Sequence, residues 1–214
     1  MTCNIIATGS RGNAILLNGA YLLDCGVPFS KLKHVYKGIK IVFLTHVHMD
    51  HANIKTIKKL HKERPTLRFA CPPWFIETMI DAGINQKQID LFEPGEAYFY
   101  LNGLEAICKE IPHDVRNCAW DLVLENAESV FYATDCGTLA GIEARDRDFY
   151  LLEGNYKESE LQERIAEKYA KGEFSYETRV EQSHLSEEQA MLWLSENAGP
   201  NSRYILIHRH MDER

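Results

Sequence analysis

The chain has 214 residues, of which 45% are hydrophobic and 26% charged, and its formal net charge is −7. This length and composition are typical of one globular domain with its own core, so we expect residues 1–214 to form a single domain. The acidic balance excludes a surface that is basic throughout, although a local basic groove could still bind nucleic acid.

Apolar segments and cysteines exclude further classes. The start, MTCNIIATGS, lacks the basic and apolar regions of a signal peptide, and no apolar run is long enough to span a bilayer. We therefore expect a soluble, cytoplasmic protein without a membrane partner. The six cysteines are scattered and form no CxxC pair, so we expect buried thiols rather than a disulfide framework.

Strand patterns dominate the first half of the chain. In residues 13–26, NAILLNGAYLLDCG, two apolar runs flank Asn18-Gly19, which predicts a β-hairpin. Residues 40–46, KIVFLTH, predict a buried strand. Helices are predicted from apolar spacing over residues 53–62, and from opening prolines and a final glycine over residues 72–83.

The second half repeats the hairpin pattern and then adds helices. Residues 98–111 carry Asn102-Gly103 between apolar runs, and Ser186 and Gln189 have the spacing of a helix capping box. Further strands are predicted over residues 120–126, 129–135, 148–154 and 203–208, and helices over residues 158–172 and 186–199. Two hairpin-rich sets of strands with intervening helices indicate an α/β (α+β) fold with two sheets covered by helices.

A cluster of ligand-type side chains follows the strand at residues 40–46. It consists of His46, His48, Asp50 and His51. Imidazole nitrogen and carboxylate oxygen are ligands that zinc, manganese and ferrous iron accept in catalytic sites. Because alternate residues of a turn project the same way, His46 and His48 could share one metal while Asp50 and His51 face a second. We expect divalent metal ions, with Zn²⁺ favoured and Mn²⁺ or Fe²⁺ as alternatives. The number of bound ions, one or two, stays open.

This cluster and four other motifs resemble, in order, the motifs of the metallo-β-lactamase superfamily. The others are YLLDCG with Asp24, IPHD with His113, YATDCG with Asp135 and ILIH with His208. The resemblance covers nearly the whole chain and implies a four-layer αββα metallo-β-lactamase sandwich. It implies a first metal site of His46, His48 and His113 and a second of Asp50, His51 and His208, with Asp135 shared. It also implies that Asp24 orients the histidine loop, and His210 remains an alternative to His208.

One further motif and two single residues resemble those of nucleases in this superfamily. GSRGNA, at residues 9–14, is similar to the opening of the exonuclease-like proteins of the WalK/WalR operon. Glu153 and His184 resemble a pair in the tRNA 3′-processing endoribonuclease, RNase Z, that assists protonation of the leaving group. By this resemblance Asp50 would orient a metal-bound hydroxide, and His184, held by Glu153, would donate a proton. The alternative for His184 is a residue that packs and caps the following helix.

We therefore expect an enzyme, a metal-dependent hydrolase with phosphodiesterase or nuclease-like activity. The alternatives are a hydrolase of thioesters, lactones or cyclic phosphates, and a non-catalytic member of the fold. No insert of the kind that holds tRNA is evident, so a compact phosphodiester or a nucleic-acid end fits better than a long folded RNA. The substrate and the oligomeric state do not follow from the sequence.

Overall fold

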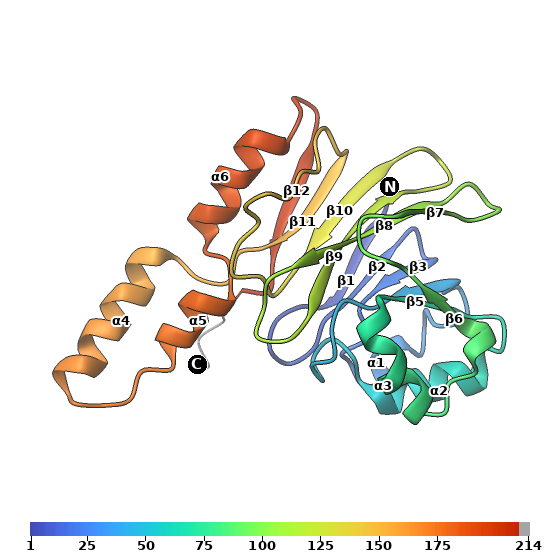
Figure 1. Ribbon diagram of the computed structural model, residues 1–214, viewed down its shortest axis with the longest axis horizontal. Coiled ribbons are helices and arrows are strands. Elements are labelled where there is room, and N and C mark those ends of the chain that lie inside the picture. The colour runs from blue at the N-terminus through green and yellow to red at the C-terminus, as the bar shows by residue number, and fades with distance from the viewer. Residues whose placement is uncertain (210–214) are drawn as a thin grey trace.

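The computed structural model describes residues 1–209, which form two six-stranded sheets stacked face to face (Figure 1). The first sheet has the order β1-β2-β3-β4-β5-β6, and the second has the order β12-β11-β10-β9-β8-β7. The first sheet consists of β1 (Cys3–Ala7), β2 (Ala14–Leu17), β3 (Tyr21–Leu23), β4 (Ile41–Phe43), β5 (Arg68–Cys71) and β6 (Ile89–Leu91). The second consists of β7 (Ala97–Phe99), β8 (Glu105–Ile111), β9 (Asn117–Val123), β10 (Ser129–Ala133), β11 (Phe149–Glu153) and β12 (Arg203–Ile207).

Helices cover the outer faces of both sheets. The first sheet is covered by α1 (Phe29–Leu32), α2 (Ile54–Glu63) and α3 (Ile76–Asp81), and the second by α6 (Glu187–Asn197). The pair α4 (Glu158–Ala170) and α5 (Glu177–Ser183) extends to one side (Figure 1). Short 3₁₀ helices occur at η1 (Pro73–Phe75) and η2 (Gln86–Gln88). The four layers confirm the predicted αββα sandwich.

Successive side chains of a strand point to opposite faces of its sheet. Three apolar layers result: one between the sheets, one under α1 to α3 and one under α6. In β2, Ile15 and Leu17 face the core between the sheets, whereas Leu16 packs with the residues under α1 to α3. Trp120 of β9 is fully buried between the sheets, and its indole N–H donates to the Leu44 carbonyl at 3.2 Å. The sheets are therefore locked together directly beside the histidine-rich loop.

Both predicted hairpins are confirmed. Asn18 and Gly19 have φ values of 48° and 66°, the two positive angles that a type I′ turn requires, and they join β2 to β3. Asn102-Gly103 joins β7 to β8 in the same antiparallel way. The helix predicted over residues 72–83 starts as a 3₁₀ turn, and the strand predicted over residues 120–126 instead begins at Asn117.

Two other sequence expectations concern cysteines and membrane segments. All six cysteines are free, and all are buried except the half-buried Cys3, as predicted. Within residues 1–209, no helix combines the length and the apolar character needed to cross a bilayer.

Candidate metal centre

Strand ends from both sheets meet at one edge of the sandwich. Asp24 follows β3, Asp135 follows β10 and His208 follows β12. These three residues have positive φ values of 56°, 52° and 53°. Non-glycine residues rarely adopt this left-handed conformation, and such strain is concentrated at functional sites. The backbone therefore turns sharply at each of the three strand ends, where the site lies.

The predicted ligands come together as two groups. One is His46, His48, His113 and Asp135; the other is Asp50, His51, Asp135 and His208. Within each group, one nitrogen or oxygen atom from every residue lies within 4.8 Å of those of the others. Asp135 belongs to both groups, as the predicted shared ligand would. The competing His210 lies outside the described residues.

The Asp135 carboxylate lies between the two groups. Its Oδ2 is 2.8 Å from His51 Nε2 and 3.3 Å from His46 Nε2, while its Oδ1 is 3.1 Å from His208 Nδ1. Burial opposes ionisation, but the charges of His51 and His208 hold the pKa of Asp135 well below its usual value. A buried, ionised carboxylate is thus available to both groups.

Unpartnered nitrogen atoms show that the cluster fits divalent metal ions. The Nε2 atoms of His46 and His208 are buried and have no hydrogen-bond partner. Burial, with the nearby His51, lowers the pKa of His46 to about 4, so this imidazole is neutral with a free lone pair at pH 7. Orphaned polar atoms of this kind are uncommon in protein interiors, and a bound cation would satisfy both.

Hydrogen bonds behind the histidines fix how two rings point. Asp24, which is fully buried, accepts from His51 Nδ1 at 2.7 Å, from Tyr132 at 2.7 Å and from the Thr45 hydroxyl at 2.9 Å. His113 Nδ1 donates to the Ser183 carbonyl at 3.0 Å. Each bond leaves Nε2 of the ring facing the cluster, an arrangement common around metal ligands. The geometry agrees with the orienting role expected of Asp24.

The loop that carries Asp50 and His51 packs against two earlier segments. A Cβ on Gly26 would lie 1.6 Å from the Asp50 carbonyl oxygen, so only glycine fits there. Asn13 donates its backbone N–H to the same carbonyl at 2.6 Å, and its amide nitrogen lies 2.8 Å from His51 Nε2. The GSRGNA motif therefore contributes Asn13 to the site, a residue that was not among the predicted ligands.

Glu153 and His184 lie side by side next to the second group. His184 Nδ1 is 2.6 Å from Glu153 Oε1 and 3.5 Å from Asp135 Oδ1. The His184 ring stacks on that of His208, with centroids 5.6 Å apart and planes at 12°. Glu153 is fully buried and also accepts from the backbone N–H of Cys136 at 2.9 Å. The predicted pair is thus held rigidly beside the shared carboxylate.

The alternative role for His184, capping the next helix, is wrong. The side chain that caps α6 is Ser186, whose hydroxyl accepts from the Gln189 N–H at 3.0 Å. Gln189 returns the bond to the Ser186 N–H at 2.9 Å, which completes the predicted capping box. The His184 imidazole points instead to Glu153.

A pocket of about 300 Å³ opens over both groups. On its wall Asp114 Oδ1 lies 3.1 Å from His113 Nε2 and 3.4 Å from His48 Nε2, and Asp114 also pairs with Arg179 of α5. Neither Asp114 nor Arg179 was predicted. The position of Asp114 directly after His113 was the only signal of it in the sequence.

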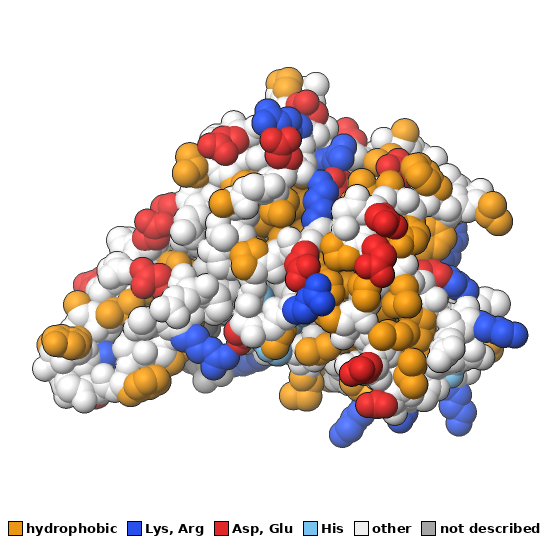
Figure 2. Space-filling model, viewed as in Figure 1, with side chains coloured by type: hydrophobic (Ala, Val, Ile, Leu, Met, Phe, Trp, Pro, Cys, Tyr) orange, Lys and Arg blue, Asp and Glu red, His pale blue; other side chains and the backbone are white. Residues whose placement is uncertain are grey.

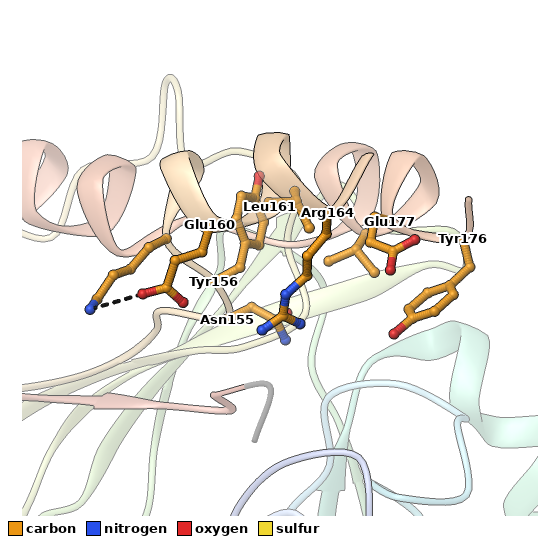
Figure 3. Close-up of a pocket in the computed structure, with 9 residues that line it drawn as sticks. Asn155, Tyr156, Glu160, Leu161, Arg164, Tyr176 and Glu177 are labelled. Carbon is orange, nitrogen blue, oxygen red and sulfur yellow. Dashed lines mark ion pairs between the residues drawn. The ribbon is translucent and has the colours of Figure 1, made fainter. Parts of the chain in front are cut away.

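A second, smaller pocket of about 30 Å³ lies between α4, α5 and the end of β11 (Figure 3). Asn155 and Arg164 both line it, and it shares Tyr176 and Val180 with the larger pocket. The Asn155 amide nitrogen donates to the His208 carbonyl at 2.9 Å. Asn155 therefore links the α4–α5 side to the last residue of the cluster.

Residues 20–209 match the β-lactamase superfamily domain. No curated protein sequence matches the chain. Among solved structures, the metallo-β-lactamase fold protein YhfI from Bacillus subtilis has a TM-score of 0.72 at 17% identity, covering 99% of this chain and 87% of that chain. The short form of human tRNase Z has a TM-score of 0.67 at 14% identity, covering 98% and 92%. Zn²⁺-bound PqqB from Methylobacterium extorquens has a TM-score of 0.67 at 13% identity, covering 98% and 89%.

Proposed function

The chain belongs to the β-lactamase superfamily, whose fold is generally hydrolytic, and from that premise we propose that it is a phosphodiesterase with two divalent metal ions. The observation that carries this proposal is the Glu153–His184 pair beside Asp135. Alkoxide leaving groups of phosphodiesters need a proton, and a buried carboxylate that holds an imidazole next to the cluster is suited to supply one.

Two structural neighbours support the finer assignments. Human tRNase Z is a ribonuclease by its name, which favours phosphodiester chemistry on this fold. PqqB is Zn²⁺-bound, which favours zinc among the divalent metals. We propose His46, His48, His113 and Asp135 as ligands of one ion and Asp50, His51, Asp135 and His208 as ligands of the other.

Bound at these ligands, the metals would supply Lewis acidity toward water and toward the phosphoryl oxygen. Asp50 Oδ2 lies 3.7 Å from His208 Nε2, and although burial opposes it, the interactions of Asp50 with His208 and with His51 lower the pKa of Asp50. Asp50 is thus ionised and can orient the attacking water and accept its proton. Burial likewise opposes a charge on His184, but Glu153 raises the pKa of His184, so the proton that the leaving oxygen needs is present near neutral pH.

A panel of substrates tests the proposal. Protein purified without chelator would be assayed on bis(p-nitrophenyl) phosphate, a thioester, a lactone and short single-stranded oligonucleotides. We expect the phosphodiesters to have the highest kcat/KM. A faster thioester or lactone would replace the proposal with the second candidate, a hydrolase of another ester class, which the modest pocket of about 300 Å³ would also accommodate.

Metal uptake is expected to release protons. Burial opposes charge on both His51 and His208, but neighbouring carboxylates raise the pKa of His51 well above its usual value and that of His208 to about 10. Both rings are therefore protonated at pH 7 in the metal-free protein and must lose a proton to bind metal. Titration calorimetry with zinc in buffers of different ionisation enthalpy should give about two protons per loaded chain. Affinity should rise between pH 6 and pH 8; pH-independent binding without proton release would contradict the assignment of both ligands.

A further inference from the structure

Basic residues are concentrated in one segment of this acidic chain. Residues 29–68 contain ten of the 24 lysines and arginines but only two of the 31 aspartates and glutamates. In Figure 2, several blue side chains project around the end of the molecule that carries α1 to α3, and others lie over its upper and central parts. Residues 1–28 and 69–214 together are acidic, so a general basic character of the protein does not account for this segment.

The centre of this segment is a lysine face on α2, made of Lys55, Lys58, Lys59 and Lys62. These residues recur at three- and four-residue steps, opposite the buried Ile57 and Leu60, and all four are exposed. None of them takes part in an ion pair of the described residues; Lys59 lies over the Phe29 ring, 4.5 Å from its centroid. Beside them, the exposed Lys31, Lys33 and Lys37 on and after α1 are equally without ion pairs within residues 1–209.

The stability of the helix does not account for this whole arrangement. Lys55 stands in the first turn of α2, which contains no acidic residue, although the positive end of the helix dipole favours acidic side chains there. Lysines three and four positions apart also repel one another. Lys62 in the last turn is favoured by the helix dipole and Lys59 lies over Phe29, but neither reason applies to Lys55 and Lys58, which points to a role outside the fold.

The lysine face begins beside the metal centre. Asn53 caps α2 only two residues after His51, and its backbone N–H is bonded to the Cys25 carbonyl next to Asp24. From Lys55 to Lys62 the helix extends for about 10 Å away from that loop. A polyanion held along α2 would therefore lead to the pocket over the ligands.

We propose that the lysine face binds the phosphates of single-stranded nucleic acid and guides one strand toward the metal centre. This inference rests on the proposed phosphodiesterase function and names its substrate class. A pocket of about 300 Å³ admits one strand more readily than a duplex. The exposed positions of α2 are all charged, so the face offers phosphate contacts without base readout, and binding is independent of sequence.

The same composition disfavours a membrane as the partner. Helices that lie on membranes insert leucine or aromatic side chains between their basic residues. On α2 the large apolar side chains pack into the core with the first sheet instead. Anionic vesicles are nevertheless included in the test.

The experiment compares two variants with equal changes in net charge. K55E/K58E/K62E reverses the lysine face but keeps Lys59 on Phe29, whereas K87E/R145E/K171E reverses three exposed basic residues elsewhere. Binding of a fluorescein-labelled 12-nucleotide oligothymidine would be followed by anisotropy across a salt series, and the oligonucleotide checked for integrity afterwards. Hydrolysis of bis(p-nitrophenyl) phosphate, which is too small to reach along α2, would report on the metal centre of each protein.

We expect K55E/K58E/K62E to bind the oligonucleotide at least about tenfold more weakly than the parent. The slope of its log affinity against log salt concentration should be shallower by about 2. K87E/R145E/K171E should bind like the parent. Equal binding by both variants would overturn the inference, and so would a parent that binds phosphatidylserine vesicles but no oligonucleotide. If K55E/K58E/K62E loses helicity by circular dichroism, K58Q/K62Q should still weaken binding. If K55E/K58E/K62E loses oligonucleotide binding but the parent does not hydrolyse bis(p-nitrophenyl) phosphate, the proposed function is refuted and the lysine face remains supported.

Discussion

Asp135→Ala is expected to deplete both metal positions and to abolish hydrolysis. Asp135 is the only residue common to the two ligand groups, and its two oxygens face different histidines. Loss of a residue that merely orients a ligand weakens metal binding by about 10- to 100-fold, so loss of the shared carboxylate should exceed about 100-fold at each position. Elemental analysis and zinc titration would measure the change.

The control is Asp146→Ala. Asp146 is exposed and has a φ of 56°, so it reproduces the cost of placing alanine in the left-handed conformation without touching the cluster. This variant should keep two equivalents of metal. An Asp135→Ala protein that also kept two equivalents, with parental affinity, would show that the carboxylate does not bridge.

His184→Ala is expected to lower kcat on phosphodiesters with poor leaving groups by roughly 10² to 10⁴ while metal content stays nearly constant. His184 is bonded to Glu153 and lies beyond the two proposed ligand groups. The loss should be smaller for bis(p-nitrophenyl) phosphate, because p-nitrophenolate leaves without a proton. Comparing kcat for the two leaving groups separates proton donation from a general disturbance of the site.

Ser186→Ala provides the matched comparison two residues away. It removes the cap of α6 and should cost about 1 kcal/mol in the free energy of unfolding without changing the leaving-group dependence. Equal rates for the His184→Ala protein and the parent on an alkyl diester would rule out the catalytic role. Loss of metal together with rate would instead make His184 a ligand, as the third group of Asp135, Glu153, His184 and His208 would allow.

Much of the fold could be predicted because its signals are local. Asn-Gly turns and the capping box specify their own backbone, and both hairpins and the start of α6 were placed correctly. β1, β5 and β6 were missed, because strands of three to five residues are defined by their neighbours in the sheet more than by their own pattern. The seven-residue α5 was missed for a similar reason, since it is too short to show a clear apolar period.

The site was predicted as a set of residues, not as an arrangement. The local cluster at residues 46–51 and the resemblance to the superfamily's motifs identified the histidines and aspartates that the structure brings together. It could not show that the Ser183 carbonyl fixes His113, that Asn13 reaches His51, or that Arg179 and Asp114 close one wall of the pocket. Those contacts join residues that are 38 to 70 positions apart, so they exist only in the folded tertiary structure.

The two ligand groups require different lengths of the chain. Every member of the first group, from His46 to Asp135, lies in the first two thirds of the chain, whereas the second group also requires His208. His208 takes its place only when β12 pairs with β11 and its backbone N–H bonds to the Thr8 hydroxyl, 200 residues earlier. The residues before β11 therefore contain every donor of the first group, whereas the second group also requires that β12 has paired with β11. Full metal occupancy thus requires that β12 has joined the second sheet.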